Sequence, residues 1–346
     1  MTTKNLNHKL TGSGNLLDEK GVLREAGWAD SLVYDYSRSM VKSNKARLKE
    51  WDYYHVIDSE GKYAVSFTFA DNGYMGLIDC SVFDFITKEK FSATEVPIMP
   101  MGKLNLPSTS EKGDISFKNK SCTFHIDRTE TGRHFYCDFK RTFNHTEIVA
   151  DIYLEQPPMD TMVIATPWKE SKSAFYYNQK INCMRASGTI EYDGVTYELN
   201  PETDYGTLDW GRGVWTYDNT WYWGSGNATV NGKPFGFNIG YGFGDTTAAS
   251  ENMLFYDGKC HKLDDVTFNI PASSYTDPWT FTSSDGRFEM NFVPILDRAA
   301  KIDIKFIITD QHQVFGRMSG KAILDDGQVI ELKDCLCFAE DVHNKY

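Results

Sequence analysis

Short runs in which apolar and polar residues alternate are the feature that most limits how this chain can fold. They lie at residues 62–70, 121–127, 133–140 and 147–154. Side chains of a strand point alternately to its two faces, so this pattern is typical of half-buried β-strands. Asp-Gly and Asn-Gly pairs that suit tight hairpins separate other strand-like runs and begin at Asp193, Asn231, Asp257, Asp285 and Asp326. The sequence therefore predicts an all-β antiparallel fold, with a short, partly helical N-terminal segment before residue 55.

The length and an internal similarity indicate two domains. A chain of 346 residues exceeds the usual size of one hydrophobic core. The segment at 187–199 resembles the segment at 319–332, and each has the form of an Asp-Gly hairpin. Equivalent hairpins would arise if each half of the chain ended on the same strand pair, although two such hairpins can also look alike by chance. We expect antiparallel β-barrel domains at residues 1–217 and 218–346.

Three sequence features indicate where the protein acts and what it can bind. They are the net charge, the length of the apolar runs and the number of cysteines. The formal net charge of −12 opposes binding to a phosphate backbone, so we expect no nucleic-acid partner. No run of about 18 apolar residues occurs, so we expect no integral membrane segment. Seven cysteines, an odd number, favour reduced thiols over a disulfide framework. We therefore expect a cytoplasmic protein that acts on a small molecule, and the sequence indicates no particular oligomeric state.

The densest unusual segment is residues 208–224, which holds four of the eight tryptophans. Within it, Gly211 and Gly213 flank Arg212, and such glycines would allow a sharp turn that brings Asp209 and Arg212 into one cavity with aromatic walls. The alternative is a structural ion pair between Asp209 and Arg212 at a domain junction, with the tryptophans as packing.

The Trp-rich segment and several later motifs resemble a bacterial family of uncharacterised proteins, DUF2804. The resemblance covers most of the chain after residue 10 and rests on Asp-Trp-Gly-Arg-Gly-Val-Trp at 209–215, Trp-Tyr-Trp-Gly-Ser at 221–225, Gly-Tyr-Gly-Phe-Gly-Asp at 240–245, Ser-Glu-Asn at 250–252, Phe-Gly-Arg-Met-Ser-Gly at 315–320, Asp-Asp-Gly at 325–327 and Phe-Ala-Glu at 338–340.

That family in turn resembles the double-lipocalin proteins of the carotenoid 1,2-hydratase, AttH and tocopherol-cyclase type. The resemblance implies two lipocalin-like barrels and an acidic residue, here Asp209, near their junction. Gly211 and Arg212 stand where those proteins carry a glutamate. Their chemistry needs a carboxylic acid that protonates an alkene, which requires a carboxyl kept neutral by burial. If Arg212 pairs with Asp209, Glu251 or Asp245 would be the proton donor.

Three functions remain open at this point. The first is a cofactor-independent hydratase, isomerase or cyclase that acts on an apolar or unsaturated molecule. The second is a carrier of lipophilic ligands, and the third is a carbohydrate-active enzyme with paired carboxylates. We expect no cofactor and no metal, because Cys335 with Cys337 and Cys260 with His261 lack a second ligand pair. The candidate catalytic residues are Asp209, Arg212 and Glu251, and the candidate binding residues are Trp210, Trp215, Trp221, Tyr222, Trp223, Asp245 and Asn252.

Overall fold

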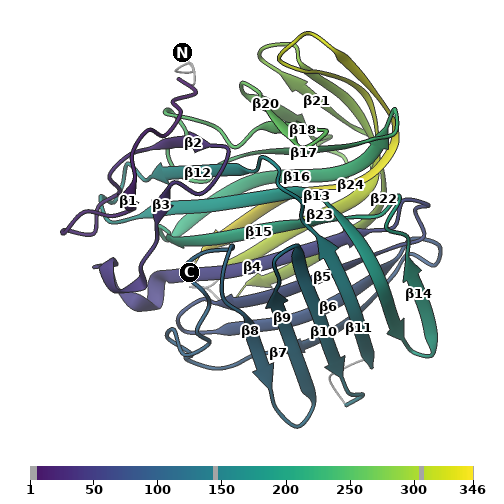
Figure 1. Ribbon diagram of the computed structural model, residues 1–346, viewed down its shortest axis with the longest axis horizontal. Helices are drawn as coiled ribbons and strands as arrows, with labels where there is room; N and C mark the ends of the chain where they lie inside the picture. Colours follow the sequence, from purple (N-terminus) through teal and green to yellow (C-terminus); the bar gives the residue numbers. More distant parts are fainter. Residues whose placement is uncertain (1–5, 143–146, 304–307, 346) are drawn as a thin grey trace.

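The computed structural model describes residues 6–142, 147–303 and 308–345, and these consist mainly of antiparallel strands in two curled sheets (Figure 1). The helical elements in the described ranges are the 3₁₀ turns η1 (Arg38–Met40) and η2 (Lys45–Arg47). Both precede residue 55. The prediction of an all-β chain with a short, partly helical N-terminal segment is confirmed.

The first sheet has 13 strands within the described ranges, and its main path runs in the order β7-β6-β5-β4-β15-β13-β11-β10-β9-β8. Its strands are β2 (Gly27–Ala29), β4 (Leu48–Ile57), β5 (Tyr63–Asp71), β6 (Gly76–Asp84), β7 (Glu89–Glu95), β8 (Ile115–Lys118), β9 (Cys122–Arg128), β10 (Gly132–Phe139), β11 (Ile148–Glu155), β12 (Met162–Pro167), β13 (Phe175–Tyr192), β14 (Val195–Leu199) and β15 (Tyr205–Val214). The four alternating runs of the sequence correspond to β5, β9, β10 and β11.

The second sheet has nine strands in the described residues, in the order β19-β18-β17-β16-β24-β23-β22-β21-β20. These are β16 (Asp218–Val230), β17 (Lys233–Tyr241), β18 (Met253–Tyr256), β19 (Lys259–Lys262), β20 (Val266–Asn269), β21 (Trp279–Ser283), β22 (Phe288–Asp303), β23 (Ile308–Ile323) and β24 (Val329–Lys345). A small parallel pair, β1 (Gly14–Asn15) with β3 (Tyr34–Asp35), lies apart from both sheets. The two large sheets divide the chain between Val214 and Asp218, and separate folding of the two halves stays a prediction.

Tight turns join neighbouring strands as the Asp-Gly and Asn-Gly pairs indicate. Both residues of the pair have positive φ at Asp193-Gly194 and at Asn231-Gly232. This conformation matches the twist of two-residue hairpins, and glycine adopts it without strain. The hairpins β13–β14 and β16–β17 follow from these turns.

Three apolar clusters fill the molecule. One fills the interior of the first sheet, including Phe67 and Phe135, and another fills the second, including Phe237 and Phe292. The third joins residues of both sheets, among them Tyr176 of β13, Trp223 of β16 and Phe338 of β24. The outer faces of β4, β15 and β13 therefore pack against the outer faces of β16 and β24, and this contact layer positions the candidate site.

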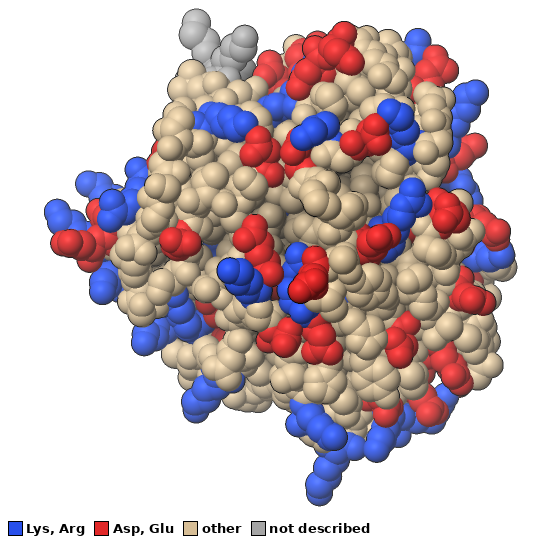
Figure 2. Space-filling model, viewed as in Figure 1, with Lys and Arg blue, Asp and Glu red and all other residues tan. Residues whose placement is uncertain are grey.

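On the face shown in Figure 2, acidic and basic side chains are interspersed, without a continuous basic patch. In the ranges that the structure describes, no helix is long and apolar enough to cross a membrane.

Candidate functional site

Two rows of polar side chains meet where the sheets pack together. In the first sheet Lys180 pairs in register with Asp209, and Asp209 with Tyr53. In the second sheet Trp223 pairs with Glu340, and Glu340 with Gln313. The rows touch, because the Gln313 amide lies 3.4 Å from the Tyr53 hydroxyl and the Lys180 ammonium lies 3.8 Å from the centre of a Trp223 ring.

Lys180 and Asp209 form a buried ion pair. Their charged atoms are 2.9 Å apart, and the side chains are only 1% and 10% exposed. The Asn178 amide donates a hydrogen bond to the same carboxylate, at 2.6 Å. A lysine buried to this degree is rare without a partner. Here both the carboxylate and the Trp223 π face offset the loss of water around the ammonium.

Two further carboxyls, Glu251 and Glu340, are buried beside this pair. Burial raises the pKa of Glu251 from 4.5 to about 7, and the nearby Lys180 charge opposes that rise. Burial likewise raises the pKa of Glu340 from 4.5 to about 7 against the hydrogen bond from Trp221. The Trp221 indole N–H donates to Glu340 at 3.0 Å. Near neutral pH each carboxyl can therefore hold or release a proton.

Asp209 and Glu340 line a cavity of about 260 Å³ between the two sheets. Aromatic rings and polar side chains share its walls. Trp215 contacts both Trp221 and Trp51 at ring-centre distances of 5.1 Å and 5.8 Å. The aromatic residues that line it are Trp51, Tyr53, Trp215, Trp221, Trp223 and Phe243. Alternation along β16 places Trp221 and Trp223 on one face, where both line this cavity, whereas Tyr222 packs against Tyr241 and Phe268 in the second core.

Asp209 and Arg212 do not form the expected pair. The glycines at 211 and 213 were expected to turn the backbone, but β15 continues as a strand from Tyr205 to Val214. Positions 209 and 212 therefore face opposite sides of the sheet. Arg212 instead bonds to Asp52 at 2.9 Å, in the first half of the molecule, where its guanidinium lies 4.4 Å from the Trp210 ring. Trp210 is likewise buried in the first core, away from the cavity.

The two glycines make room for aromatic rings. A Cβ at Gly211 would overlap the Trp51 ring, and a Cβ at Gly213 would lie 3.1 Å from the Trp215 indole nitrogen. Missing side chains at these outward positions therefore let Trp51 and Trp215 lie against the strand. The Asp-Trp-Gly-Arg-Gly-Val-Trp motif places Asp209 and Trp215 at the cavity and its Trp-x-Arg pair in the core.

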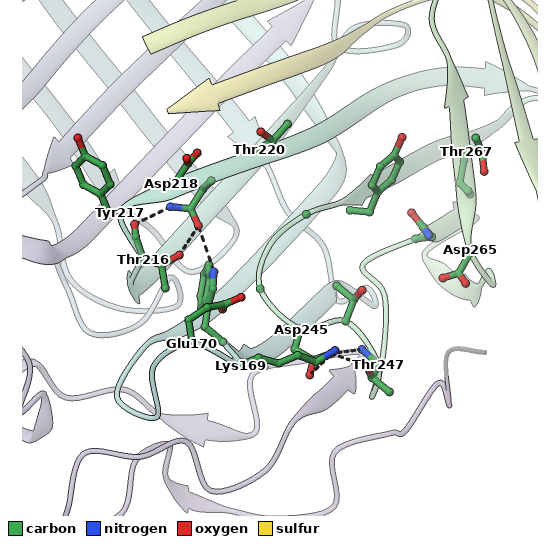
Figure 3. Close-up of a pocket in the computed structure, with 18 residues that line it drawn as sticks. Lys169, Glu170, Thr216, Tyr217, Asp218, Thr220, Asp245, Thr247, Asp265 and Thr267 are labelled. Atoms are coloured by element: carbon green, nitrogen blue, oxygen red, sulfur yellow. Dashed lines mark hydrogen bonds and ion pairs between the residues drawn. The ribbon is translucent and has the colours of Figure 1, made fainter. Parts of the chain in front are cut away.

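Asp245 and Asn252 line a different hollow. This hollow measures about 930 Å³ and is polar, with Asp245 bonded to Thr247 and Asp265 nearby (Figure 3). Asn252 accepts a hydrogen bond from the Gly240 N–H at 2.7 Å and donates to the Asp264 carbonyl at 2.9 Å. It thereby fixes the loop that carries Glu251. Of the ten candidate residues, those at the cavity are Asp209, Trp215, Trp221 and Trp223, with Glu251 buried behind them.

Sequence reasoning missed Lys180, Glu340 and Asn178. Glu340 is part of the Phe-Ala-Glu motif, and Lys180 lies among polar residues in Asn-Gln-Lys-Ile-Asn at 178–182, but neither local sequence indicates the residue that it contacts. The strand register pairs Lys180 with Asp209, 29 positions apart in sequence, and Trp223 with Glu340, 117 positions apart, which local patterns do not encode. A lysine inside a strand that is otherwise buried was the one available signal.

Comparisons with known proteins agree with this architecture. The family model DUF2804, described as a domain of unknown function, matches residues 7–346. The chain belongs to this family. No protein with a curated functional description matches the sequence.

The structure is also similar to solved structures at low sequence identity. A protein named only provisionally as AttH, from Nitrosomonas europaea, is 11% identical with a TM-score of 0.52, over 89% of this chain and 96% of that one. Kievitone hydratase from Nectria haematococca is 10% identical with a TM-score of 0.49, over 96% and 98%. CghA with Sch210972 is 10% identical with a TM-score of 0.46, over 95% and 97%. The first of these shows that this chain and that protein share a fold.

No group of three or more His, Cys, Asp or Glu side chains suited to a metal ion occurs in the described ranges. The absence of a cofactor requirement stays a prediction.

Proposed function

We propose that this DUF2804 protein is an acid–base enzyme of the hydratase, isomerase or cyclase kind, which acts on an apolar or unsaturated small molecule in the cavity between the sheets. The observation that carries this proposal is the buried group of Asp209, Glu251 and Glu340 around Lys180. Burial raises the pKa of both glutamates to about 7. Such values suit a group that must both give and take protons near neutral pH.

Glu340 is the proton donor in this proposal. It lines the cavity, and Trp221 and Gln313 hold its two carboxyl oxygens. Its O–H bond breaks as a C–H bond forms at one carbon of a substrate double bond. The cation at the other carbon lies among Trp215, Trp221 and Trp223, whose π faces favour positive charge.

Asp209 completes the reaction as the base. It removes a proton from a water molecule that attacks the cation, which gives hydration, or from a neighbouring carbon, which gives isomerisation. Lys180 holds the Asp209 carboxylate at the cavity wall. The proton that Asp209 takes up then passes to Glu251 and from Glu251 to Glu340, directly or through water, so protons balance over one turnover. Arg212 has no contact with this path and holds β15 against the first core through Asp52.

A carrier of lipophilic ligands is the second candidate, because six aromatic side chains line the cavity. The cytoplasmic location and the carbohydrate-active alternative stay predictions from sequence.

The first test identifies the compound that copurifies with the native protein by mass spectrometry, and then follows that compound in ²H₂O with the protein. An acid–base enzyme introduces deuterium at carbon, whereas a carrier does not. Asp209→Asn should lower this incorporation by roughly a hundredfold with binding nearly unchanged. Trp223→Ala should mainly weaken binding, by about 3 kcal/mol at most. Equal, small effects of both changes on rate and binding would contradict the proposal.

A further inference from the structure

The Glu251 carboxyl occupies the place of a side chain that Gly240 of β17 lacks. A Cβ at Gly240 would lie 2.3 Å from the Glu251 Oε1 atom. Gly240 pairs in register with Trp223, and Trp223 pairs on its other side with Glu340. Directly paired residues of antiparallel strands point to the same face of a sheet. The carboxyls of Glu251 and Glu340 therefore flank Trp223 in one row across the second sheet.

A buried amide joins Trp223 to the backbone of Glu251. The Trp223 indole N–H donates to Asn238 Oδ1 at 2.7 Å, and Asn238 Nδ2 donates to the Glu251 carbonyl at 2.9 Å. Asn238 is fully buried in β17, two residues before Gly240. An indole N–H can only donate and a carbonyl can only accept, so these two partners fix which way the amide faces.

Lys262 of β19 holds the same segment from another side. Its ammonium donates to Ser250 Oγ at 2.9 Å and to the Asn252 carbonyl at 3.0 Å. These bonds fix the two neighbours of Glu251, whereas Asn238 bonds to Glu251 itself. The place of the Glu251 backbone relative to the cavity wall therefore depends on the Asn238 amide.

The place of the Glu251 carboxyl determines how readily it holds a proton. Burial raises the pKa of Glu251 from 4.5 to about 7. The other titratable groups that act on this carboxyl are Lys180, Asp209, Glu340, Lys262 and Tyr176. Burial and interactions between charges both weaken when a carboxyl moves toward water. A displacement of the backbone at residue 251 would therefore change the proton affinity of the acid.

We propose that Asn238 is a positioning residue of the acid–base reaction, because its amide holds the Glu251 backbone at a fixed place relative to Trp223. This inference rests on the proposed function, in which Glu251 passes the proton on to Glu340. Without the amide, the segment at 250–252 should move, so that water reaches the Glu251 carboxyl and the proton returns more slowly. The Trp223 ring stays in the cavity wall, so ligand binding should change little.

The test combines ¹³C NMR of labelled glutamate side chains with the deuterium assay, both on the full chain. Asn238→Leu keeps a similar volume and removes both hydrogen bonds. The Glu251 carboxyl signal, assigned by its loss in Glu251→Gln, should titrate near pH 7 in the wild type. Its midpoint should lie at least about one pH unit lower in Asn238→Leu. At saturating concentrations of the copurifying compound, deuterium incorporation should fall about tenfold or more, with affinity changed by less than about threefold.

Asn219→Leu is the matched control. Asn219 of β16 is also a buried amide between an indole and a backbone carbonyl, because it accepts from the Trp168 N–H at 3.2 Å and donates to the Thr216 carbonyl at 2.7 Å. Its loss should lower the free energy of unfolding comparably and leave the Glu251 midpoint in place. Asn238→Ser is the second variant, because it adds no bulk and its hydroxyl is too short to span both partners. It should lower the midpoint as well.

Three results would overturn the proposal: an unchanged Glu251 midpoint in both Asn238 variants, an equal shift in Asn219→Leu, or a shifted midpoint with an unchanged rate of incorporation. Each of these leaves the proposed function standing. A wild-type protein that incorporates no deuterium overturns the proposed function instead, whereas the Glu251 midpoints still decide whether Asn238 positions this carboxyl.

Discussion

Two buried ion pairs sit three residues apart on β15, and they differ in what surrounds them. Arg212 bonds to Asp52 and also donates to the carbonyls of Trp51, Gly211 and Pro107. Lys180 bonds to Asp209, lies against a Trp223 ring and has two carboxyls of raised pKa nearby. The first pair is surrounded by fixed protein acceptors, whereas the second shares a cavity with groups that can exchange protons. We infer that the first stabilises the fold and the second is available for chemistry.

Removing the cation from each pair should separate these roles most strongly. Arg212→Met leaves Asp52 and three carbonyls buried without their donor, and we expect it to lower the free energy of unfolding by about 3–5 kcal/mol. Lys180→Met should lower it by less than about 2 kcal/mol near pH 6, because neighbouring carboxyls can take up a proton instead. Urea unfolding followed by tryptophan fluorescence measures both. Equal losses would show that the two pairs have the same structural role.

Much of the fold could be predicted from the sequence because strand alternation and hairpin turns are local. The runs at 62–70 and 133–140 and the turns at Asp193 and Asn231 appear in the structure as expected. The site could be predicted only in part. Asp209 and the tryptophans were found because they cluster in sequence, but Lys180 and Glu340 reach Asp209 only through pairing between distant strands. The predicted turn at Gly211 and Gly213 is wrong. A glycine can be required where a side chain would not fit as well as where the backbone must turn, and the sequence alone does not distinguish the two.

A methyl group at Gly211 should disturb the cavity face of β15 and leave the core face intact. The added carbon would overlap the Trp51 ring, and overpacking of this kind usually costs about 1–3 kcal/mol. We expect Gly211→Ala to lower the free energy of unfolding by that amount and to weaken ligand binding. Trp51→Phe in the same chain supplies the matched rescue, because a smaller ring leaves room for the methyl. If Gly211→Ala is as stable as the wild type, Trp51 does not depend on this glycine.

The buried glutamates Glu251 and Glu340 should make the free energy of unfolding depend on pH. Glu251 and Glu340 keep their protons to about pH 7 in the folded chain, against 4.5 as the ordinary value. The unfolded chain therefore releases protons between pH 4.5 and 7 that the folded chain retains. Their contribution to stability is fully present below pH 4.5 and is lost as pH rises toward 7. The effect should be on the order of 3 kcal/mol for each glutamate.

The check compares the wild type with the double variant Glu251→Gln/Glu340→Gln in urea unfolding from pH 4.5 to 8. The stability difference between the two should change across that window. The double variant Glu19→Gln/Glu202→Gln, at two exposed positions, is the control and should follow the wild type at every pH. A constant difference between wild type and the buried double variant would mean that these glutamates titrate in the ordinary range.

The central claim is that a carboxyl at the cavity holds its proton near neutral pH, and ¹³C NMR of labelled glutamate side chains tests it without knowledge of the substrate. The Glu340 carboxyl signal, assigned by its loss in Glu340→Gln, should titrate with a midpoint near pH 7. Lys180→Met should move that midpoint upward, because the Lys180 charge opposes the rise in the pKa of Glu340. A midpoint between about 4 and 5 in the wild type would contradict the account, because the carboxyl would then be ionised at neutral pH and could not serve as the acid.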